Sequence, residues 1–139
     1  MSLRSVISVF FDTNVWLPAT VSDGWTRRLV GSAESQGIVW ISAELLDEVV
    51  EKLALKFQAS WGTIEEAKAL IVKSGSMFSE QVTPDSRSPD PDDALLLAQA
   101  LAAKCGHFVT NDKRLLELVS IDEMRIVSPR EFATLLGVS

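Results

Sequence analysis

The sequence contains one cysteine and one histidine, and both scarcities exclude a class of chemistry. A lone cysteine cannot form a disulfide within the chain, and a lone histidine cannot build a cluster of imidazole ligands. The lone histidine also argues against a metal-free ribonuclease that uses two imidazoles as acid and base. No apolar run approaches the roughly 18 residues that a membrane helix requires. We therefore expect a cytoplasmic protein without a membrane anchor or a secretory leader.

Basic residues are also scarce. The sequence has 13 Lys and Arg and 19 Asp and Glu, which gives a net charge of −6. Proteins that hold nucleic acid by their own surface are usually basic, since they must neutralise phosphates. An acidic protein can still act on phosphates if bound cations supply the positive charge. Alternatively, the acidity serves solubility alone. The positions of the carboxylates must decide between these two interpretations.

The length and composition are those of one globular domain. The chain has 139 residues, of which 47% are hydrophobic and 23% charged. Single cores usually span about 100–200 residues, and a chain of this length buries enough surface to fold without a disulfide or a structural metal. Repeats and low-complexity tracts are absent from the sequence. We predict a single domain over residues 1–139.

Short runs of β-branched and aromatic residues alternate with longer stretches that have apolar residues at helical spacing. This alternation predicts an α/β fold in which helices cover both faces of a mostly parallel five-stranded sheet. The spacings also leave room for the crossovers of about a dozen residues that parallel strands need. The predicted strands span residues 6–11, 38–41, 77–82, 107–110 and 124–127, and the predicted helices span residues 26–36, 43–57, 63–73, 94–104, 113–119 and 129 onward.

Acidic residues follow the predicted strands at one edge of the sheet. Asp12 comes directly after the first strand, and Asp112 follows the fourth. Asp93 lies in the first turn of the helix after the third strand, and Glu48 lies about two turns into the helix after the second. Sites in open parallel sheets form outside the carboxyl ends of the strands. We therefore expect these four carboxylates to converge.

Clustered carboxylates need compensation, because like charges a few ångström apart cannot all stay ionised. Divalent cations supply it, and an all-oxygen set of ligands suits Mg²⁺ or Mn²⁺. Two such metals about 4 Å apart can activate a water and stabilise the leaving oxygen of a phosphodiester. The acidic composition then fits a protein that acts on phosphates.

Four segments carry these acids in a recognisable order. The chain reads Asp-Thr-Asn at 12–14, Ser-Ala-Glu-Leu-Leu-Asp-Glu at 42–48, Asp-Pro-Asp-Asp-Ala-Leu-Leu-Leu-Ala at 90–98 and Thr-Asn-Asp at 110–112. Together they resemble the acidic motifs of the PIN domain family. With their spacing and strand context, the resemblance covers roughly residues 6–132. It is closest to the small prokaryotic PIN proteins that are toxin components of toxin–antitoxin pairs, the VapC-like ribonucleases.

The resemblance implies a three-layer α/β/α fold and a Mg²⁺- or Mn²⁺-dependent ribonuclease that leaves a 5′-phosphate and a 3′-hydroxyl. It also implies an RNA substrate, a homodimer and, for a toxin, a neutralising antitoxin. The implied catalytic and metal-binding residues are Asp12, Glu48, Asp93 and Asp112. The implied supporting residues are Thr13, Asn14, Asp90, Thr110 and Asn111. Asp90 and Asp92 have the same chemistry as Asp93, so whether either shares its metal role stays open.

Each acid also has a purely structural interpretation. Asp12, Asp90 and Asp112 stand where a helix N-cap is expected. Glu48 resembles an ordinary solvated helix residue, and Lys113 and Arg114 are equally a solvated pair or contacts for substrate phosphates. Caps alone do not require four acids at one edge of one sheet, so we favour the metal site.

Other functions remain as alternatives. A phosphatase of the haloacid dehalogenase type would use Asp12 as a covalent nucleophile, but such enzymes favour a second Asp where Asn14 stands. A response-regulator receiver domain would need an Asp at the end of the third strand and a Lys at the end of the fifth. The sequence has Val-Thr-Pro at 82–84 and Val-Ser-Pro at 127–129 instead. A catalytically silent PIN scaffold that binds a partner is the remaining alternative.

Overall fold

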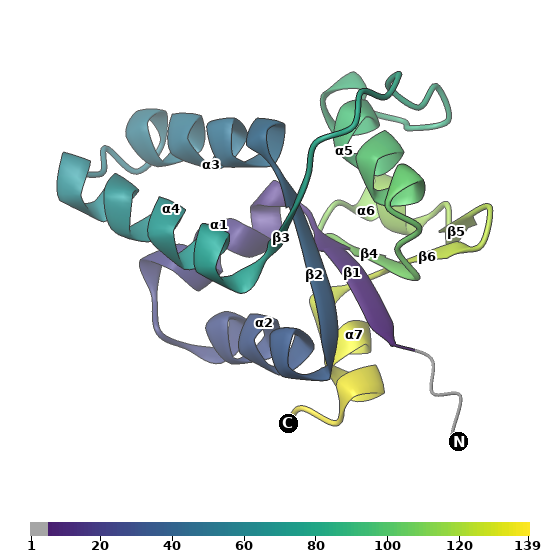
Figure 1. The fold of residues 1–139 in the computed structure, drawn as a ribbon, viewed down its shortest axis with the longest axis horizontal. Helices are drawn as coiled ribbons and strands as arrows, with labels where there is room; N and C mark the ends of the chain where they lie inside the picture. Colours follow the sequence, from purple (N-terminus) through teal and green to yellow (C-terminus); the bar gives the residue numbers. More distant parts are fainter. Residues whose placement is uncertain (1–5) are drawn as a thin grey trace.

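The computed structural model describes residues 6–139, so residues 1–5 of the predicted domain lie outside the described residues. A mostly parallel sheet runs through the middle of the structure (Figure 1). Its order is β3-β2-β1-β4-β6-β5, and only the β5–β6 pair is antiparallel within the described residues. The strands are β1 (Ile7–Phe11), β2 (Gly37–Ser42), β3 (Ser76–Phe78), β4 (His107–Val109), β5 (Ser120–Ile121) and β6 (Met124–Val127).

The sheet has six strands, so the prediction of five was wrong by one edge strand. The additional strand, β5, is two residues long and pairs with β6 through a tight turn in which Asp122 has φ 53°. A strand of two residues is too short to show an alternating pattern. The third strand is also shorter than predicted, because residues 79–82 leave the sheet after Phe78.

Seven helices accompany these strands within residues 6–139, and none of them is long and apolar enough to span a membrane. They are α1 (Thr13–Val21), α2 (Trp25–Gln36), α3 (Ala43–Leu55), α4 (Trp61–Ser74), α5 (Pro91–Ala102), α6 (Lys113–Leu116) and α7 (Pro129–Leu136).

Helix α1 was absent from the prediction. Most of its side chains are buried, so it shows no amphipathic period, and Pro18 lies inside it. Several predicted helix boundaries were also wrong by two or three residues, including the ends of α3 at Leu55 and of α5 at Ala102. Helix α4 begins at Trp61 rather than at residue 63, because the Ser60 hydroxyl accepts a hydrogen bond from the Thr63 N–H and caps the helix there. Helix α6 ends at Leu116 rather than at residue 119.

The sheet is the middle layer of the predicted three-layer α/β/α arrangement. In Figure 1, α1 to α4 lie on one side of the strands and α5 lies on the other. On the first side the Phe11 ring meets Trp16 of α1 and Phe132 of α7 edge-on, with centroids 5.8 and 5.7 Å apart. Phe10 points the opposite way from its neighbour in β1 and stacks on Phe108 of β4 at 5.8 Å.

The ends of β1 and β4 fix the position of the candidate site. Phe11 and Val109 are register partners, so both strands end at the same level. Asp12 and Thr110, the residues directly after β1 and β4, continue the hydrogen bonding of the sheet. The Asp12 N–H donates to the Val109 carbonyl at 2.9 Å, and the Thr110 N–H donates to the Val127 carbonyl at 3.0 Å. Asp12 and Thr110 are therefore held side by side by backbone hydrogen bonds.

Candidate metal centre

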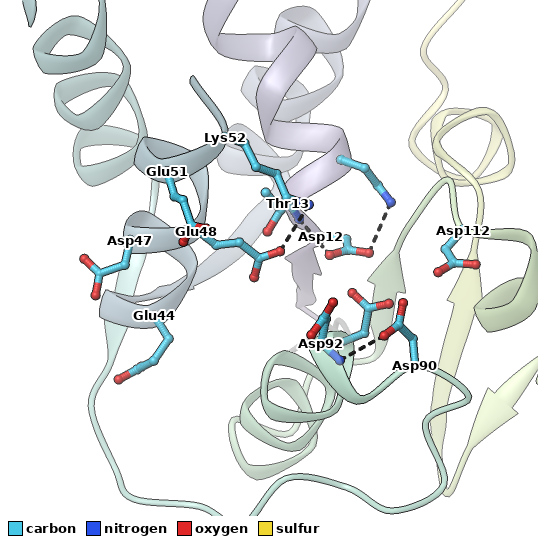
Figure 2. A pocket seen from close by; sticks show the side chains of 12 residues that line it. Asp12, Thr13, Glu44, Asp47, Glu48, Glu51, Lys52, Asp90, Asp92 and Asp112 are labelled. Carbon is cyan, nitrogen blue, oxygen red and sulfur yellow. Dashed lines mark hydrogen bonds and ion pairs between the residues drawn. The ribbon is translucent and has the colours of Figure 1, made fainter. Parts of the chain in front are cut away.

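The carboxyl ends of the strands open into an acidic pocket of about 520 Å³ (Figure 2). All four acids predicted for the site line it, as do Asp90 and Asp92. Nine of its twelve lining residues carry a carboxylate, and Lys52 supplies the one positive charge among them. The acids are Asp12, Glu44, Asp47, Glu48, Glu51, Asp90, Asp92, Asp93 and Asp112, and Thr13 and Asn14 complete the lining. The convergence expected from the strand ends is therefore present.

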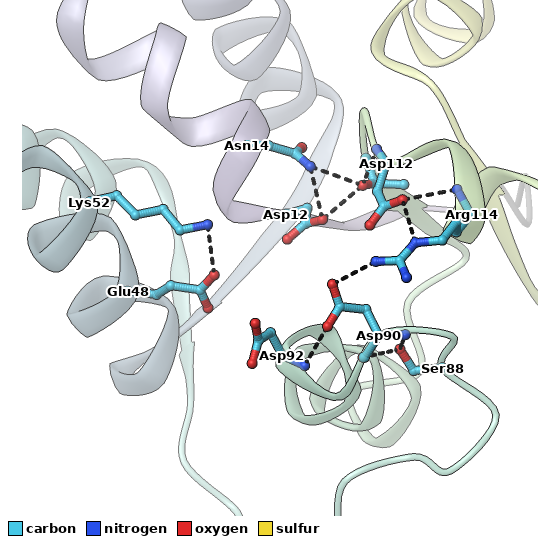
Figure 3. A network of polar contacts seen from close by, with 10 residues as sticks. Asp12, Asn14, Glu48, Lys52, Ser88, Asp90, Asp92, Asp112 and Arg114 are labelled. Atoms are coloured by element: carbon cyan, nitrogen blue, oxygen red, sulfur yellow. Dashed lines mark hydrogen bonds and ion pairs between the residues drawn. The ribbon is translucent and has the colours of Figure 1, made fainter. Parts of the chain in front are cut away.

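Asp12 is the most deeply buried acid of the pocket, with 2% of its surface exposed. It caps α1, as its oxygen Oδ1 accepts a hydrogen bond of 2.8 Å from the Thr13 N–H. Its other oxygen, Oδ2, accepts from the Thr110 hydroxyl at 2.7 Å and from the Asn14 amide at 3.3 Å (Figure 3). These donors hold the carboxylate in one orientation with its charge buried at the floor of the site.

Thr110 connects the first and the last acidic motif. While its hydroxyl donates to Asp12, the same oxygen accepts from the Asp112 N–H at 3.0 Å and from the Asn14 amide at 3.3 Å. Asn14 in turn accepts from the Asn111 N–H at 3.1 Å. Three of the predicted supporting residues thus contact Asp12 directly, whereas Asn111 acts only through Asn14.

Replacing Thr110 by valine is expected to destabilise the protein by about 1–2 kcal/mol at pH 8, because it leaves a buried carboxylate without its shortest hydrogen bond. Thr110→Ser keeps the hydroxyl and should recover most of the loss. Thermal unfolding measures both, with Thr134→Val on the exposed side of α7 as the matched control. Equal stability of the Thr110 and Thr134 valine variants would show that the Thr110 hydroxyl does not hold Asp12.

Asp90, Asp93 and Asp112 bring one oxygen each to within 4.8 Å of one another. Asp90 caps α5 by accepting from the Asp92 N–H, and Asp112 caps α6 by accepting from the Arg114 N–H. The capping interpretation is thus correct for these two acids, and it does not conflict with the cluster. It does not explain Asp93, which is 8% exposed and whose carboxylate makes no hydrogen bond within residues 6–139.

The two buried acids have strongly raised pKa values. Burial raises the pKa of Asp12 to about 6, although its hydrogen bonds to Thr110 and Thr13 lower it in part. Burial also raises the pKa of Asp93 to about 7, and the charges of Asp12, Asp90, Asp112 and Glu48 add to the effect. Without a counter-ion, the site therefore takes up protons near neutral pH.

Glu48 lies on α3, across the pocket from the three clustered aspartates (Figure 2). It pairs with Lys52 one turn further along the helix, at 3.4 Å. It lies outside the group of oxygens within 4.8 Å, although its charge raises the pKa of both Asp12 and Asp93. The structure thus places both Glu48 and Asp12 in the pocket but outside its closest cluster, which contains Asp93 and Asp112 of the four predicted ligands together with Asp90.

Several pocket residues were missed by the sequence reasoning. Glu44 and Glu51 are not among the predicted site residues, yet both line the pocket together with Glu48. Their spacing of four and three residues puts them on one face of a helix, and that periodicity could have found them. Lys52 follows from the same spacing. Gln99 on α5 is buried and donates to Glu44 at 2.7 Å, a contact that no sequence pattern signals.

Comparison with known families matches a model described as the PIN domain to residues 8–114, which is most of the chain. The chain belongs to the PIN domain family. The resemblance predicted from the acidic motifs is thereby confirmed, and the matched range contains Asp12, Glu48, Asp93 and Asp112. PIN domains are nucleases as a family, and an acidic cluster is present in this one.

A solved structure supports the fold of this PIN domain. It resembles a chain in the crystal structure of VapBC2 from Rickettsia felis bound to a DNA fragment from their promoter, with a TM-score of 0.62. The sequences are 12% identical over 88% of this chain and 98% of that one. No curated protein matched the sequence. At this identity the likeness concerns the fold, and the roles of the four acids in metal binding stay predictions.

Proposed function

We propose that this PIN domain is a Mg²⁺- or Mn²⁺-dependent endoribonuclease that hydrolyses RNA phosphodiesters. The observation that carries the proposal is the concentration of acids around two buried residues, Asp12 at the carboxyl end of β1 and Asp93 in the first turn of α5. Structural capping accounts for some of these acids, but it does not account for Asp93, whose carboxylate faces the pocket and accepts no hydrogen bond within residues 6–139.

The donor atoms of the pocket fit a hard divalent cation. They are carboxylate oxygens, together with the buried Thr13 hydroxyl, whose oxygen has no partner within residues 6–139. The residues that would hold the metal are Asp12, Glu48, Asp93 and Asp112, and Asp90 is near enough to share with Asp93 and Asp112. The bound metal would supply an activated water and charge stabilisation for the leaving 3′-oxygen.

The negative charge of the pocket also explains why a cation must bind there before RNA can bind. Nine carboxylates and one lysine line the pocket, and this field repels a phosphate backbone. The chain's own contribution is to hold the acids in place before the cation arrives. Thr110 and Asn14 fix the orientation of Asp12, while the caps of α5 and α6 fix Asp90 and Asp112.

We further propose that the protein is a VapC-like toxin of the cytoplasm that binds an antitoxin and forms a homodimer. The resemblance to a chain of the VapBC2 complex supports the antitoxin partner. Three large apolar side chains at the connection between α3 and α4 support a protein contact there. Leu55, Phe57 and Trp61 are 72%, 53% and 77% exposed, and such a group is typical of an interaction surface.

The test is cleavage of a labelled single-stranded RNA in Mg²⁺, in Mn²⁺ and in EDTA. We expect cutting in either metal, with 5′-phosphate ends, and at least a 100-fold slower reaction in EDTA, as removal of a catalytic metal predicts. Cutting that persists in EDTA would contradict the metal-dependent mechanism. If no RNA is cut, titration of Mn²⁺ decides whether the pocket binds metal at all, and binding without cleavage would favour the silent scaffold.

A further inference from the structure

Arg114 places a positive charge on the edge of the acidic cluster. It lies in the first turn of α6, and its Nη2 donates to Asp90 Oδ2 at 2.9 Å (Figure 3). Its Nε lies 3.9 Å from Asp112 Oδ1. The guanidinium therefore connects the acid that caps α5 with the acid that caps α6.

Asp90 and Asp112 are also two of the three acids whose oxygens lie within 4.8 Å of one another. A divalent cation bound by these oxygens and a guanidinium on the same carboxylates would repel each other at short range. The two cations therefore compete for the same negative charge. Arg114 is the one basic residue that pairs with this three-acid cluster within residues 6–139.

We propose that Arg114 is a built-in counter-ion, which stabilises the cluster without metal and is displaced when a divalent cation binds there. The inference rests on the proposed function in one respect, namely that the pocket takes up a divalent metal. The Arg114 side chain is 59% exposed, so its ion pairs are weak enough to exchange. Its backbone N–H remains bonded to Asp112 at 2.9 Å, so only the side chain must move.

The neighbouring Lys113 provides a matched control. It is exposed, lies in the same turn of α6 and makes no ion pair within the described part of the chain. Arg114→Gln and Lys113→Gln each remove one positive charge from the same helix. A difference between them therefore reports the contact with Asp90 and Asp112 rather than the change in net charge.

Calorimetric titration of Mn²⁺ at low salt into the metal-free wild type, Arg114→Gln, Lys113→Gln and Arg114→Lys tests the proposal. We expect Arg114→Gln to lower the Kd about two- to fivefold relative to Lys113→Gln, the range that an exposed ion pair supports. Arg114→Lys should fall between the wild type and Arg114→Gln. A Kd for Arg114→Gln that equals or exceeds that of Lys113→Gln would overturn the inference, although the proposed function would stand. If no variant binds Mn²⁺, the metal-dependent function itself fails.

A second measurement follows the guanidinium directly. The Nε–H resonance of Arg114, assigned by its loss in Arg114→Gln, should shift during a Mg²⁺ titration with the midpoint that calorimetry gives. An Arg114 resonance that stays unchanged while Mg²⁺ binds would contradict displacement. Because the Arg114 side chain is exposed, all variants should fold, and circular dichroism checks this before the titrations.

Discussion

Asp12→Asn is expected to slow RNA cleavage by at least about 100-fold while leaving the protein folded. The substitution changes charge and leaves the volume almost unchanged, so the packing around the buried side chain is kept. The remaining oxygen can still accept from the Thr13 N–H and cap α1. What is lost is the negative charge at the floor of the pocket, which a divalent cation requires.

The matched control for this prediction is Asp23→Asn. Asp23 lies in the connection between α1 and α2, and its side chain is 83% exposed. Each variant replaces one aspartate by asparagine, so the two variants have the same net charge. Initial rates in Mg²⁺ should fall only for Asp12→Asn, and circular dichroism should give the same spectrum for both. A rate for Asp12→Asn within a factor of about three of the control would exclude Asp12 from the catalytic site.

The strand ends made the positions of Asp12 and Asp112 predictable from the sequence. A buried strand is recognised by its own residues, and the ends of parallel neighbours meet at one edge regardless of the side chains involved. Asp93 was placed by a local signal as well, since Asp90 and Pro91 mark the start of α5. These inferences depend on short stretches of chain, and short stretches are what sequence patterns describe.

The arrangement within the pocket could not be predicted in the same way. The pairing of Arg114 with Asp90 joins residues 24 positions apart, and it depends on the side-chain rotamers of two helix caps. The pairing of Glu48 with Lys52 is local, but its consequence for the metal cluster depends on how α3 packs across the sheet. Helix α1 was missed because most of its side chains are buried, which removes the periodicity that identifies a helix.

Asp93→Asn is expected to stabilise the metal-free protein by about 1–3 kcal/mol at pH 8. The pKa of Asp93 is raised from 3.8 to about 7 in the folded protein, so the folded state binds more protons than the unfolded state between these values. Stability of the metal-free wild type therefore falls as the pH rises from about 4 to about 7. Asparagine carries no charge and removes this penalty.

Asp92→Asn is the matched control, because Asp92 lies in the same turn of α5 and is exposed. Thermal unfolding in EDTA at pH 5 and pH 8 should show that Asp93→Asn raises the Tm chiefly at pH 8, whereas Asp92→Asn changes it little at either pH. An unchanged or lower Tm for Asp93→Asn at pH 8 would show that the charges of the cluster do not destabilise the fold.

Adding Mg²⁺ should make the wild type more stable than Asp93→Asn. A ligand that binds only the folded state raises its stability with concentration, so Mg²⁺ should raise the Tm of the wild type at pH 8. Asp93→Asn should gain little, because one carboxylate of the cluster is gone. If Asp93→Asn is more stable without metal, responds less to metal and cleaves slowly, the role of Asp93 is to bind the metal rather than to stabilise the fold. The energetic cost of holding Asp93 buried and charged is then the cost of keeping the pocket ready for its cation.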